Sequence, residues 1–305
     1  MSEADFLAAF AEAQGLGSVE ELTGQHAKRY SFQINSRERA RKAATLLHDK
    51  LGIDLQGQRV LDVGCAYGSF AIEFAKLGAQ VVGIDVNEKW LKLADENARD
   101  EVAIPFLLCD ASTIVARDML REHGPFDLVI VNDVFEHIYD TAGLLANLSA
   151  LMRPGACLYY KIPNGLATRS VLSEGHKKVF GISLLAPDYW PMFVSAPFQI
   201  YYRRWEYFDA LYERYGFEIN DFVNIHDESE EITKRHITND VARIRRRLKL
   251  KNFESRKQLS VARDACNYYF SEIASDLADD RMGWRPLFKK YRQTFWEGAL
   301  TYRGA

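Results

Sequence analysis

Short apolar runs alternate with amphipathic segments through the middle of the chain, from residue 58 to residue 225. An apolar run of this length favours a strand buried on both faces, and apolar residues at helical spacing favour a helix. Five strands are predicted in this way, with the sequences RVLDVG, AQVVGID, IPFLLCD, FDLVIVND and ACLYYKIP. Helices are predicted between them. Right-handed crossovers then give an α/β doubly wound fold around a parallel sheet.

The first 55 residues have a different pattern, with apolar residues at helical spacing and no strand-like run. We expect residues 1–55 to form an N-terminal helical cap, with Ser36 as the N-cap of its last helix. Residues 56–226 then form the core. Within it, residues 164–203 are irregular and rich in proline and aromatic residues, which is typical of a lid.

The C-terminal part is charged and helical before it becomes aromatic and alternating. We expect residues 227–290 to be a helical insertion and residues 291–305 to return to the core. The sequence FWEGALTYR predicts that residues 296–303 pair with the sheet as its final strand.

Composition and charge limit the classes of function. Hydrophobic residues make up 48% of the 305 residues and charged residues 27%, which is typical of a globular protein with a sizeable core. The net charge of −3 gives no global attraction to nucleic acid or an anionic membrane. No window holds 18 uninterrupted apolar residues and no signal peptide begins the chain, so we expect a cytoplasmic protein. The four cysteines form no CxxC pair, and we expect buried thiols.

The segment VLDVGCAYGSF, residues 60–70, joins the first strand to the first helix. Gly64 and Gly68 permit a tight turn and let a ligand approach the backbone and the helix N-terminus. The spacing is not the G-x-G-x-x-G of a dinucleotide site, and Ala66 and Tyr67 would crowd a diphosphate. A ligand with an amino-acid group, such as S-adenosylmethionine, fits better. Asp62 would meet its ammonium group, or it would only accept hydrogen bonds from loop amides.

Polar side chains also end the next three strands, where ligands bind in doubly wound sheets. Asp85 can accept both ribose hydroxyls, and Asp110 can accept a hydrogen bond from the adenine amino group. Asn132 and Asp133 would lie over the reacting sulfonium.

These residues, with the run FDLVIVNDVFEHI, resemble the class I S-adenosylmethionine-dependent methyltransferases, and most closely the ubiquinone-biosynthesis O-methyltransferase-like group. The resemblance covers roughly residues 35–225 and implies a Rossmann-like seven-stranded methyltransferase sheet. Ala66 departs from the family, which usually has glycine there. The cofactor-binding residues that the resemblance and the strand ends indicate are Asp62, Gly64, Cys65, Ala66, Gly68, Asp85, Val86, Asp110, Ala111 and Asn132.

The run NDVFEHIYD is the best candidate for chemistry. His137 has an ordinary pKa near neutrality and is a candidate general base, with Asp133 as the second catalytic candidate. Asp133, Glu136 and His137 also resemble an E-x-x-E-H run that binds a divalent metal in related methyltransferases, so a metal such as Mg²⁺ is a third option. The aspartate shortens the reach of the first ligand. A structural or cofactor-contacting role stays open, and His176 is a further candidate ligand or base.

The acceptor pocket is expected from the N-terminal helices, the lid and the insertion. Six aromatic residues would wall an apolar or ring-shaped substrate, or else pack the lid onto the sheet: Tyr189, Trp190, Phe193, Phe198, Tyr201 and Tyr202. Tyr30, Arg37 and Arg41 would reach the cofactor carboxylate, or they belong to a solvated helix face.

Residues 243–257 hold eight basic residues and one acidic residue. Such a run would bind RNA phosphates, an anionic small substrate or a second subunit, or it would be a solvated face. We expect a methyltransferase that acts on an oxygen, less readily a nitrogen, of a small metabolite, glycan precursor or secondary metabolite, with no membrane or nucleic acid partner. The alternatives are an RNA 3′-end-type methyltransferase and a non-catalytic cofactor-binding protein. The helix at 259–278 would suit a homodimer.

Overall fold

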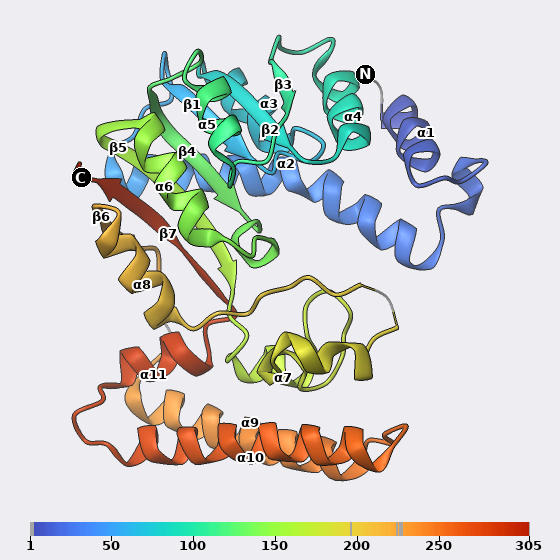
Figure 1. Cartoon of the computed structure of the whole chain (residues 1–305), viewed down its shortest axis with the longest axis vertical. Helices are drawn as coiled ribbons and strands as arrows, with labels where there is room; N and C mark the ends of the chain where they lie inside the picture. Colours follow the sequence, from blue (N-terminus) through green and yellow to red (C-terminus); the bar gives the residue numbers. More distant parts are fainter. Residues whose placement is uncertain (1–2, 196, 224, 226–227, 305) are drawn as a thin grey trace.

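The computed structural model describes residues 3–195, 197–223, 225 and 228–304. A seven-stranded sheet occupies one end of the molecule, and a layer of helices occupies the other (Figure 1). The strand order is β3-β2-β1-β4-β5-β7-β6, and all neighbours are parallel except at β7. The predicted doubly wound α/β fold is confirmed.

The first five strands follow the five predicted apolar runs, and two further strands come after them in the chain. The seven strands are β1 (Arg59–Val63), β2 (Gln80–Asp85), β3 (Phe106–Leu108), β4 (Phe126–Asn132), β5 (Met152–Pro163), β6 (Phe217–Asp221) and β7 (Phe295–Tyr302). β7 lies antiparallel between β5 and β6, so the predicted final strand does pair with the sheet. The edges of the sheet are β3 and β6.

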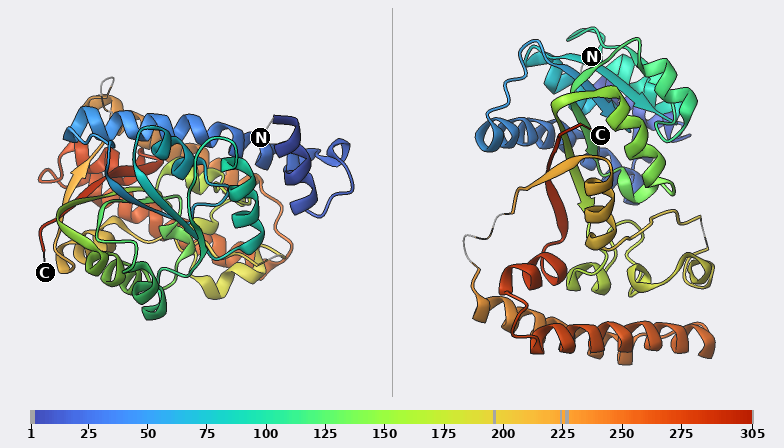
Figure 2. Two further views of the ribbon diagram at one scale, coloured as in Figure 1. Left: turned by 90° about the horizontal axis from the view of Figure 1, so that it is seen from above. Right: turned by 60° about the vertical axis from the view of Figure 1, so that its left-hand side comes forward.

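Helices cover both faces of the sheet because successive strand residues point to opposite sides. On one face, Val60, Leu128 and Ile130 pack with α2 (Gly24–Leu51) and α3 (Ser69–Lys76). On the other, Leu61, Val129 and their neighbours pack with α5 (Ile114–Leu120), α6 (Thr141–Leu151) and α8 (Trp205–Arg214). The view from above in Figure 2 shows α2 lying along its face of the sheet. All four cysteines are buried and free, as expected.

Two details of the predicted elements are wrong. Ser36 does not begin a helix, because α2 continues unbroken through it. The Ser36 side chain is buried instead, and its Oγ accepts a hydrogen bond from Arg39 Nη2 at 2.7 Å. No glycine or proline interrupts this part of α2, so nothing in the backbone stops the helix there. The sequence TAGLLANLSALMRPG, residues 141–155, predicts a helix between the fourth and fifth strands, but that helix, α6, ends at Leu151, because Pro154 cannot continue it and the chain enters β5 directly.

The N-terminal helix α1 (Glu3–Ala13) lies beside α4 (Glu88–Ala98) at the β3 side of the sheet (Figure 1). Phe6 and Phe10 form an aromatic cluster with Tyr67 from the turn between β1 and α3. A 3₁₀ turn at Val19–Glu21 joins α1 to α2. The N-terminal segment therefore packs directly on the glycine turn.

The far end of the molecule is built from α9 (Glu230–Leu250), α10 (Arg256–Ala278) and α11 (Trp284–Tyr291), shown below the sheet in the right view of Figure 2. They share a core with α7 (Thr168–Leu172) and Phe180. Asp240 links α9 to α7 and to the end of α11, because its Oδ2 accepts from Thr168 Oγ1 at 2.6 Å and from Arg292 Nη1 at 2.7 Å. Our division of the chain into cap, core, insertion and final strand remains a proposal.

The turn between β1 and α3 needs glycine for two reasons. Gly64 has φ +67° and Gly68 has φ +74°, a region that side chains disfavour. There is also no room, since a Cβ on Gly68 would lie 2.8 Å from Phe106 Cζ and one on Gly64 would lie 2.6 Å from Val134 Cγ2. The side chains of Phe106 and Val134 therefore occupy the space beside these glycines, so the glycines are needed for packing as well as for any ligand.

We predict that Gly68→Ala destabilises the fold more than Gly57→Ala does. Gly57 has the same φ of +74°, but a methyl group added to it would meet no atom within 4 Å, so its variant should lose only about 1 kcal/mol from backbone strain. Gly68→Ala adds overpacking against Phe106 and should lose about 2–4 kcal/mol. Urea denaturation measures both, and equal losses would contradict the steric argument.

Candidate functional site

The carboxyl ends of β1, β2, β4 and β5 point toward α7 and the segment after it (Figure 1). At this edge the β1–α3 turn is left-handed at three positions, because Ala66 also has a positive φ, +48°. The family that this sequence resembles usually has glycine at position 66. Here the turn keeps its shape with alanine in the left-handed region. The N-terminus of α3 therefore opens onto the sheet edge through Gly68.

Two buried aspartates hold the turn in place. Asp85 ends β2, and its Oδ2 accepts from the Ala66 amide at 3.0 Å while its Oδ1 accepts from the Asn87 amide at 2.9 Å. Asp62 lies in β1, and its Oδ2 accepts from the Ala71 amide of α3 at 3.1 Å. Burial raises the pKa of Asp85 and raises that of Asp62 to about 8. Asp62 thus contacts an amide of its own chain, in agreement with one of its two predicted roles.

The remaining cofactor candidates differ in exposure. Val86 is 69% exposed beyond β2 and is open to a ligand. Asp110 is exposed beyond β3, where its Oδ1 accepts from the amide and the hydroxyl of Ser112, and Ala111 beside it is buried. The thiol of Cys65 is buried, and burial raises its pKa well above the ordinary value. Only the backbone of Cys65 is therefore suited to ligand contact.

Asp133 follows β4 with a left-handed backbone, φ +56°. Its Oδ2 pairs with Arg39 Nη1 at 3.0 Å and accepts from Asn132 Nδ2 at 3.2 Å. Burial raises the pKa of Asp133, and Arg39 and Lys161 act in the opposite direction. This carboxylate is engaged by a cation from α2, rather than directed at Glu136 and His137.

The arginine at the site was missed by the sequence reasoning. Arg37 and Arg41 both pair with Glu73, at 3.4 and 2.8 Å, so they are held away from the sheet edge. Arg39 lies about 200° around the helix from Arg37, since each residue turns α2 by about 100°. The sequence SRERARK marks a basic stretch, but only the direction of α2 decides which arginine reaches Asp133. Tyr30 packs against Phe6 and Phe10.

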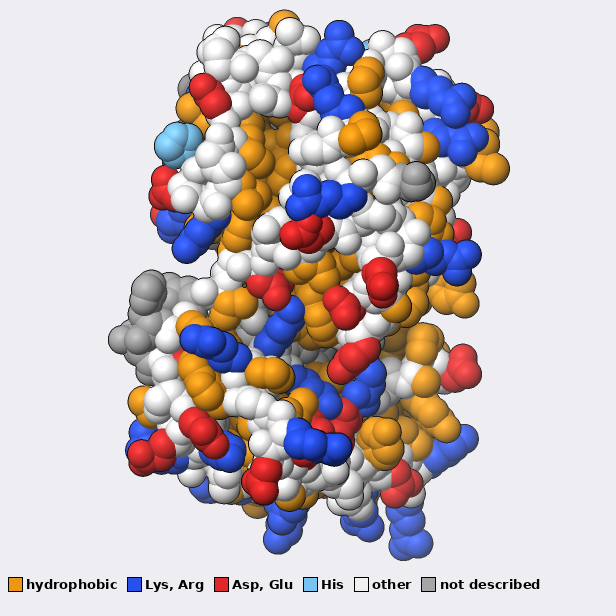
Figure 3. Space-filling model, turned by 90° about the vertical axis from the view of Figure 1, so that its left-hand side faces the viewer, with side chains coloured by type: hydrophobic (Ala, Val, Ile, Leu, Met, Phe, Trp, Pro, Cys, Tyr) orange, Lys and Arg blue, Asp and Glu red, His pale blue; other side chains and the backbone are white. Residues whose placement is uncertain are grey.

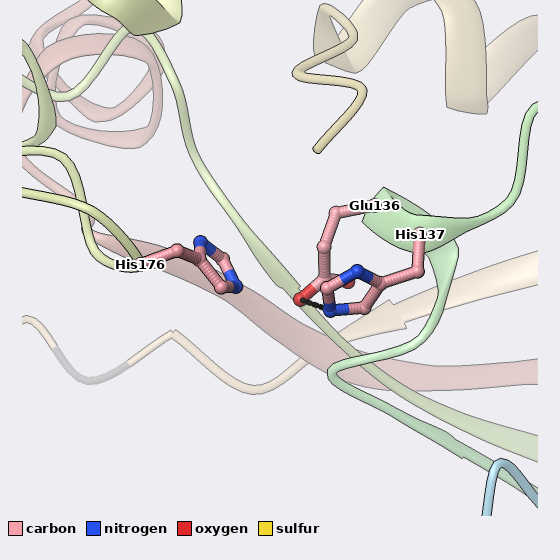
Figure 4. Close-up of side chains that lie close together, drawn as sticks. All are labelled: Glu136, His137 and His176. Carbon is pink, nitrogen blue, oxygen red and sulfur yellow. Dashed lines mark ion pairs between the residues drawn. The ribbon is translucent and has the colours of Figure 1, made fainter. Parts of the chain in front are cut away.

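Glu136, His137 and His176 meet beside this edge (Figure 4). Glu136 and His137 come from one 3₁₀ turn, Phe135–His137, and His176 comes from the lid. One potential ligand atom from each lies within 4.8 Å of the others. Glu136 is 1% exposed, and its Oε2 is a buried acceptor without a hydrogen bond. Asp133, which the sequence grouped with Glu136 and His137, is not in this cluster.

The electrostatics of the cluster differ from residue to residue. The His137 side chain is 47% exposed, but partial loss of water around the ring, with the neighbouring His176, lowers its pKa to about 4, so the imidazole is neutral near pH 7. Burial and Asp133 raise the pKa of Glu136 well above its ordinary value. A carboxylate here would gain from a cation.

His176 is oriented by a buried carboxylate. Its Nδ1 lies 2.7 Å from Oε1 of Glu174, which also accepts from the hydroxyl of Tyr202 at 2.6 Å. Burial opposes ionisation of Glu174, but these hydrogen bonds and those from two amides outweigh it and lower its pKa to about 2. With Nδ1 facing Glu174, the Nε2 atom of His176 is left to face a ligand.

The lid aromatics serve mainly to pack the lid. Trp190 and Phe198 are buried with a T-shaped contact of 4.9 Å between ring centroids, and Tyr201 packs on Trp190. Phe193 joins this cluster, whereas Tyr189 is 43% exposed. Tyr201 and Tyr202 also line a cavity, so the two predicted roles divide among the six residues.

The basic run lies on α9 and the start of α10, at the end of the molecule that carries projecting Lys and Arg side chains in Figure 3. Arg245, Arg246 and Arg247 are exposed, and Arg243 pairs with Asp240. None of the described helices combines the length and apolar character that crossing a bilayer requires.

Comparison with known proteins agrees with this geometry. The family described as "Methyltransferase domain" matches residues 36–221, which is more than half of the chain. The chain is 35% identical over 107 residues to the ubiquinone biosynthesis O-methyltransferase of Ralstonia nicotianae, covering 35% of this chain and 43% of that protein. It is 36% identical over 108 residues to that of Albidiferax ferrireducens, covering 35% and 42%. These matches span less than half of each relative.

Two solved methyltransferase structures are also similar to this chain. Magnesium protoporphyrin IX methyltransferase from Synechocystis PCC 6803, with bound SAH, is 20% identical with a TM-score of 0.47, over 71% of this chain and 89% of that one. An S-adenosylmethionine-dependent methyltransferase from Mesorhizobium loti is 17% identical with a TM-score of 0.49, over 84% and 95%.

The family match covers β1 to β6, the glycine turn and the strand ends described above, and β7 lies outside it. The chain therefore belongs to the class I S-adenosylmethionine-dependent methyltransferases.

Proposed function

We propose that the protein transfers the methyl group of S-adenosylmethionine to an oxygen atom of a small, ring-bearing metabolite. The observation that carries the proposal is the Glu136–His137–His176 cluster, which lies beside the end of β4 and beneath the aromatic lid. Methyl transfer from a sulfonium needs little more than an aligned acceptor whose proton can leave. A neutral imidazole or a cation bound at this cluster would serve a hydroxyl acceptor.

The chain's own residues would hold the cofactor in three places. Asp85 at the end of β2 would accept hydrogen bonds from the ribose hydroxyls, as an acidic residue at this place does in other doubly wound folds that bind nucleotides. Asp62 would face the ammonium group, and Arg39 would face the carboxylate of the methionine end. Asp133 then has a positioning role, because its pairing with Arg39 directs the guanidinium to the site. Gly64, Ala66, Gly68, Val86, Asp110, Ala111 and Asn132, with the backbone of Cys65, remain the proposed lining.

The cluster also fits a divalent metal. Glu136 has a buried oxygen without a partner, and His176 is held by Glu174 as metal-binding histidines usually are. Two imidazoles and one carboxylate favour Zn²⁺ over the Mg²⁺ considered from the sequence, and Mn²⁺, a harder ion, is the alternative. Bound there, the ion would lower the pKa of an acceptor hydroxyl. The ligand role of His137 and its role as general base exclude each other. The cytoplasmic location and the dimer remain predictions.

The proposed contact of Asp62 predicts a pH-dependent affinity for the cofactor product. The pKa of Asp62 is about 8 in the free protein, so the group is protonated near pH 7, whereas an adjacent ammonium favours the carboxylate. Binding of S-adenosylhomocysteine should release this proton, and the affinity should rise from about pH 6 to about pH 8, by up to about tenfold per pH unit.

Calorimetry across this pH range, in buffers of different ionisation enthalpy, measures both the affinity and the proton release. Asp62→Asn keeps an acceptor for the Ala71 amide and should flatten the profile. If the profile of the variant is as steep as that of the native protein, Asp62 does not face the ammonium.

The oxygen specificity is tested with two probes of similar shape. With isotopically labelled S-adenosylmethionine, we expect the methyl group on a hydroxyl of 4-phenylcatechol and none on the nitrogen of 4-phenylaniline. Mass spectrometry and NMR identify the products. Methylation of the amine alone, or of the 3′ end of a single-stranded RNA in place of either probe, would overturn the proposal.

The metal assignment predicts that His176→Ala abolishes retention of Zn²⁺ or Mn²⁺, whereas Asp133→Ala retains about one ion per chain. Each variant is incubated with one chloride salt, dialysed and analysed for metal, with MgCl₂ as the comparison. If the native protein retains the metal, His137 is a metal ligand. If it does not, His137 remains the candidate general base. Loss of metal in Asp133→Ala but not in His176→Ala would show that the ligands are those predicted from the sequence.

A further inference from the structure

A cavity of about 540 Å³ lies between the lid and α10. In Figure 1 this is the region between α10 and the segment that leads into α8. One wall is formed by residues 183–187 and Trp190, another by residues 201–204, and a third by α10. The volume is in the range of small-molecule sites.

The cavity shares a wall with the Glu136–His137–His176 cluster. The Tyr202 ring lines the cavity, and its hydroxyl donates to Glu174, the carboxylate that holds His176. The amide of Tyr201, the next residue back, donates to the carbonyl oxygen of Glu136 at 2.6 Å. A molecule in the cavity is therefore one residue layer away from the proposed reacting group.

The lining is chiefly apolar and aromatic. Its apolar members include Leu166, Leu184, Leu185, Ala186, Pro187, Trp190 and Ala265. Three polar side-chain groups of the lining donate hydrogen bonds within the protein. Ser183 Oγ donates to the Gly165 carbonyl at 2.8 Å, Trp190 Nε1 to that of Leu185 at 3.1 Å, and the Tyr269 hydroxyl to that of Leu166 at 2.6 Å.

The charged groups leave little for a polar ligand. Arg204 Nη2 donates to Glu272 Oε2 at 2.9 Å, and Lys290 lies 2.7 Å from the same carboxylate, which is thereby neutralised. Arg203 stacks on Tyr201 and Tyr207, and its Nη1 is a buried donor without a partner. That atom has almost no accessible surface, so it is not offered to a molecule in the cavity. The polar side chains named above therefore leave none of these groups for a sugar, which needs several polar partners to replace water.

We propose that this cavity binds the non-reacting part of the acceptor, and that this part is an apolar or aromatic ring. The inference rests on the proposed function and narrows it, because it excludes glycan precursors from the acceptors expected from the sequence. The hydroxyl that receives the methyl group would lie at the cluster, and the ring would extend past Tyr202 into the cavity.

The test compares catechol with 4-phenylcatechol by calorimetry on the protein loaded with S-adenosylhomocysteine. We expect 4-phenylcatechol to bind at least about tenfold more tightly, because its second ring is transferred from water into the apolar cavity. Ala265→Trp places an indole in the cavity from α10 and should remove this advantage, leaving the two probes within about twofold of each other.

Ala274→Trp is the matched control, since Ala274 is an exposed position on the same helix. It should keep the full advantage of the second ring. S-adenosylhomocysteine should bind the native protein and both variants equally, which shows that each is folded.

Two results would overturn the inference: equal binding of the two probes by the native protein, or an advantage that survives in Ala265→Trp. Phenyl β-glucoside binding as tightly as 4-phenylcatechol would also contradict it. These outcomes differ from a failure of the proposed function, in which the labelled methyl group does not reach the hydroxyl oxygen of either catechol.

Discussion

The hydrogen bond from the Ala66 amide to Asp85 joins the turn after β1 to the end of β2, and the geometry of the cofactor edge depends on it. Three residues of this turn have left-handed backbones, which cost free energy unless the surroundings hold them. Asp85 supplies that hold, and Val134 and Phe106 fill the space beside Gly64 and Gly68. The turn is thus set by the strands around it before any ligand binds.

The chemistry of the site comes from two segments that are far apart in the chain. The turn after β4 supplies Glu136 and His137, while the lid supplies His176, Glu174 and Tyr202. Because Glu174 accepts from both His176 and Tyr202, the orientation of the imidazole depends on the lid being in place. The lid in turn packs on α10 and shares its core with the C-terminal helices. These helices therefore support the site without belonging to the cofactor sheet.

The arginines on the two sides of α2 have different partners. Arg37 and Arg41 neutralise Glu73, which is buried, and so stabilise the packing of α2 against α3. Arg39, on the opposite side of the helix, brings a cation to the end of β4. A single basic stretch thus serves both the structure and the site.

The local sequence pattern determined the positions of the strands and of the glycine turn. Apolar runs located the strands, and the glycines with Asp62 and Asp85 indicated the edge at which we propose that the cofactor binds, because strand period and turn chemistry act over a few residues. Tertiary structure decided the rest. The rotation of α2 selected Arg39 over Arg37 and Arg41, and the fold of the lid brought His176, rather than Asp133, to Glu136 and His137. Such pairings depend on the direction of a helix and on the path of a long loop, and neither is encoded in the spacing of nearby residues.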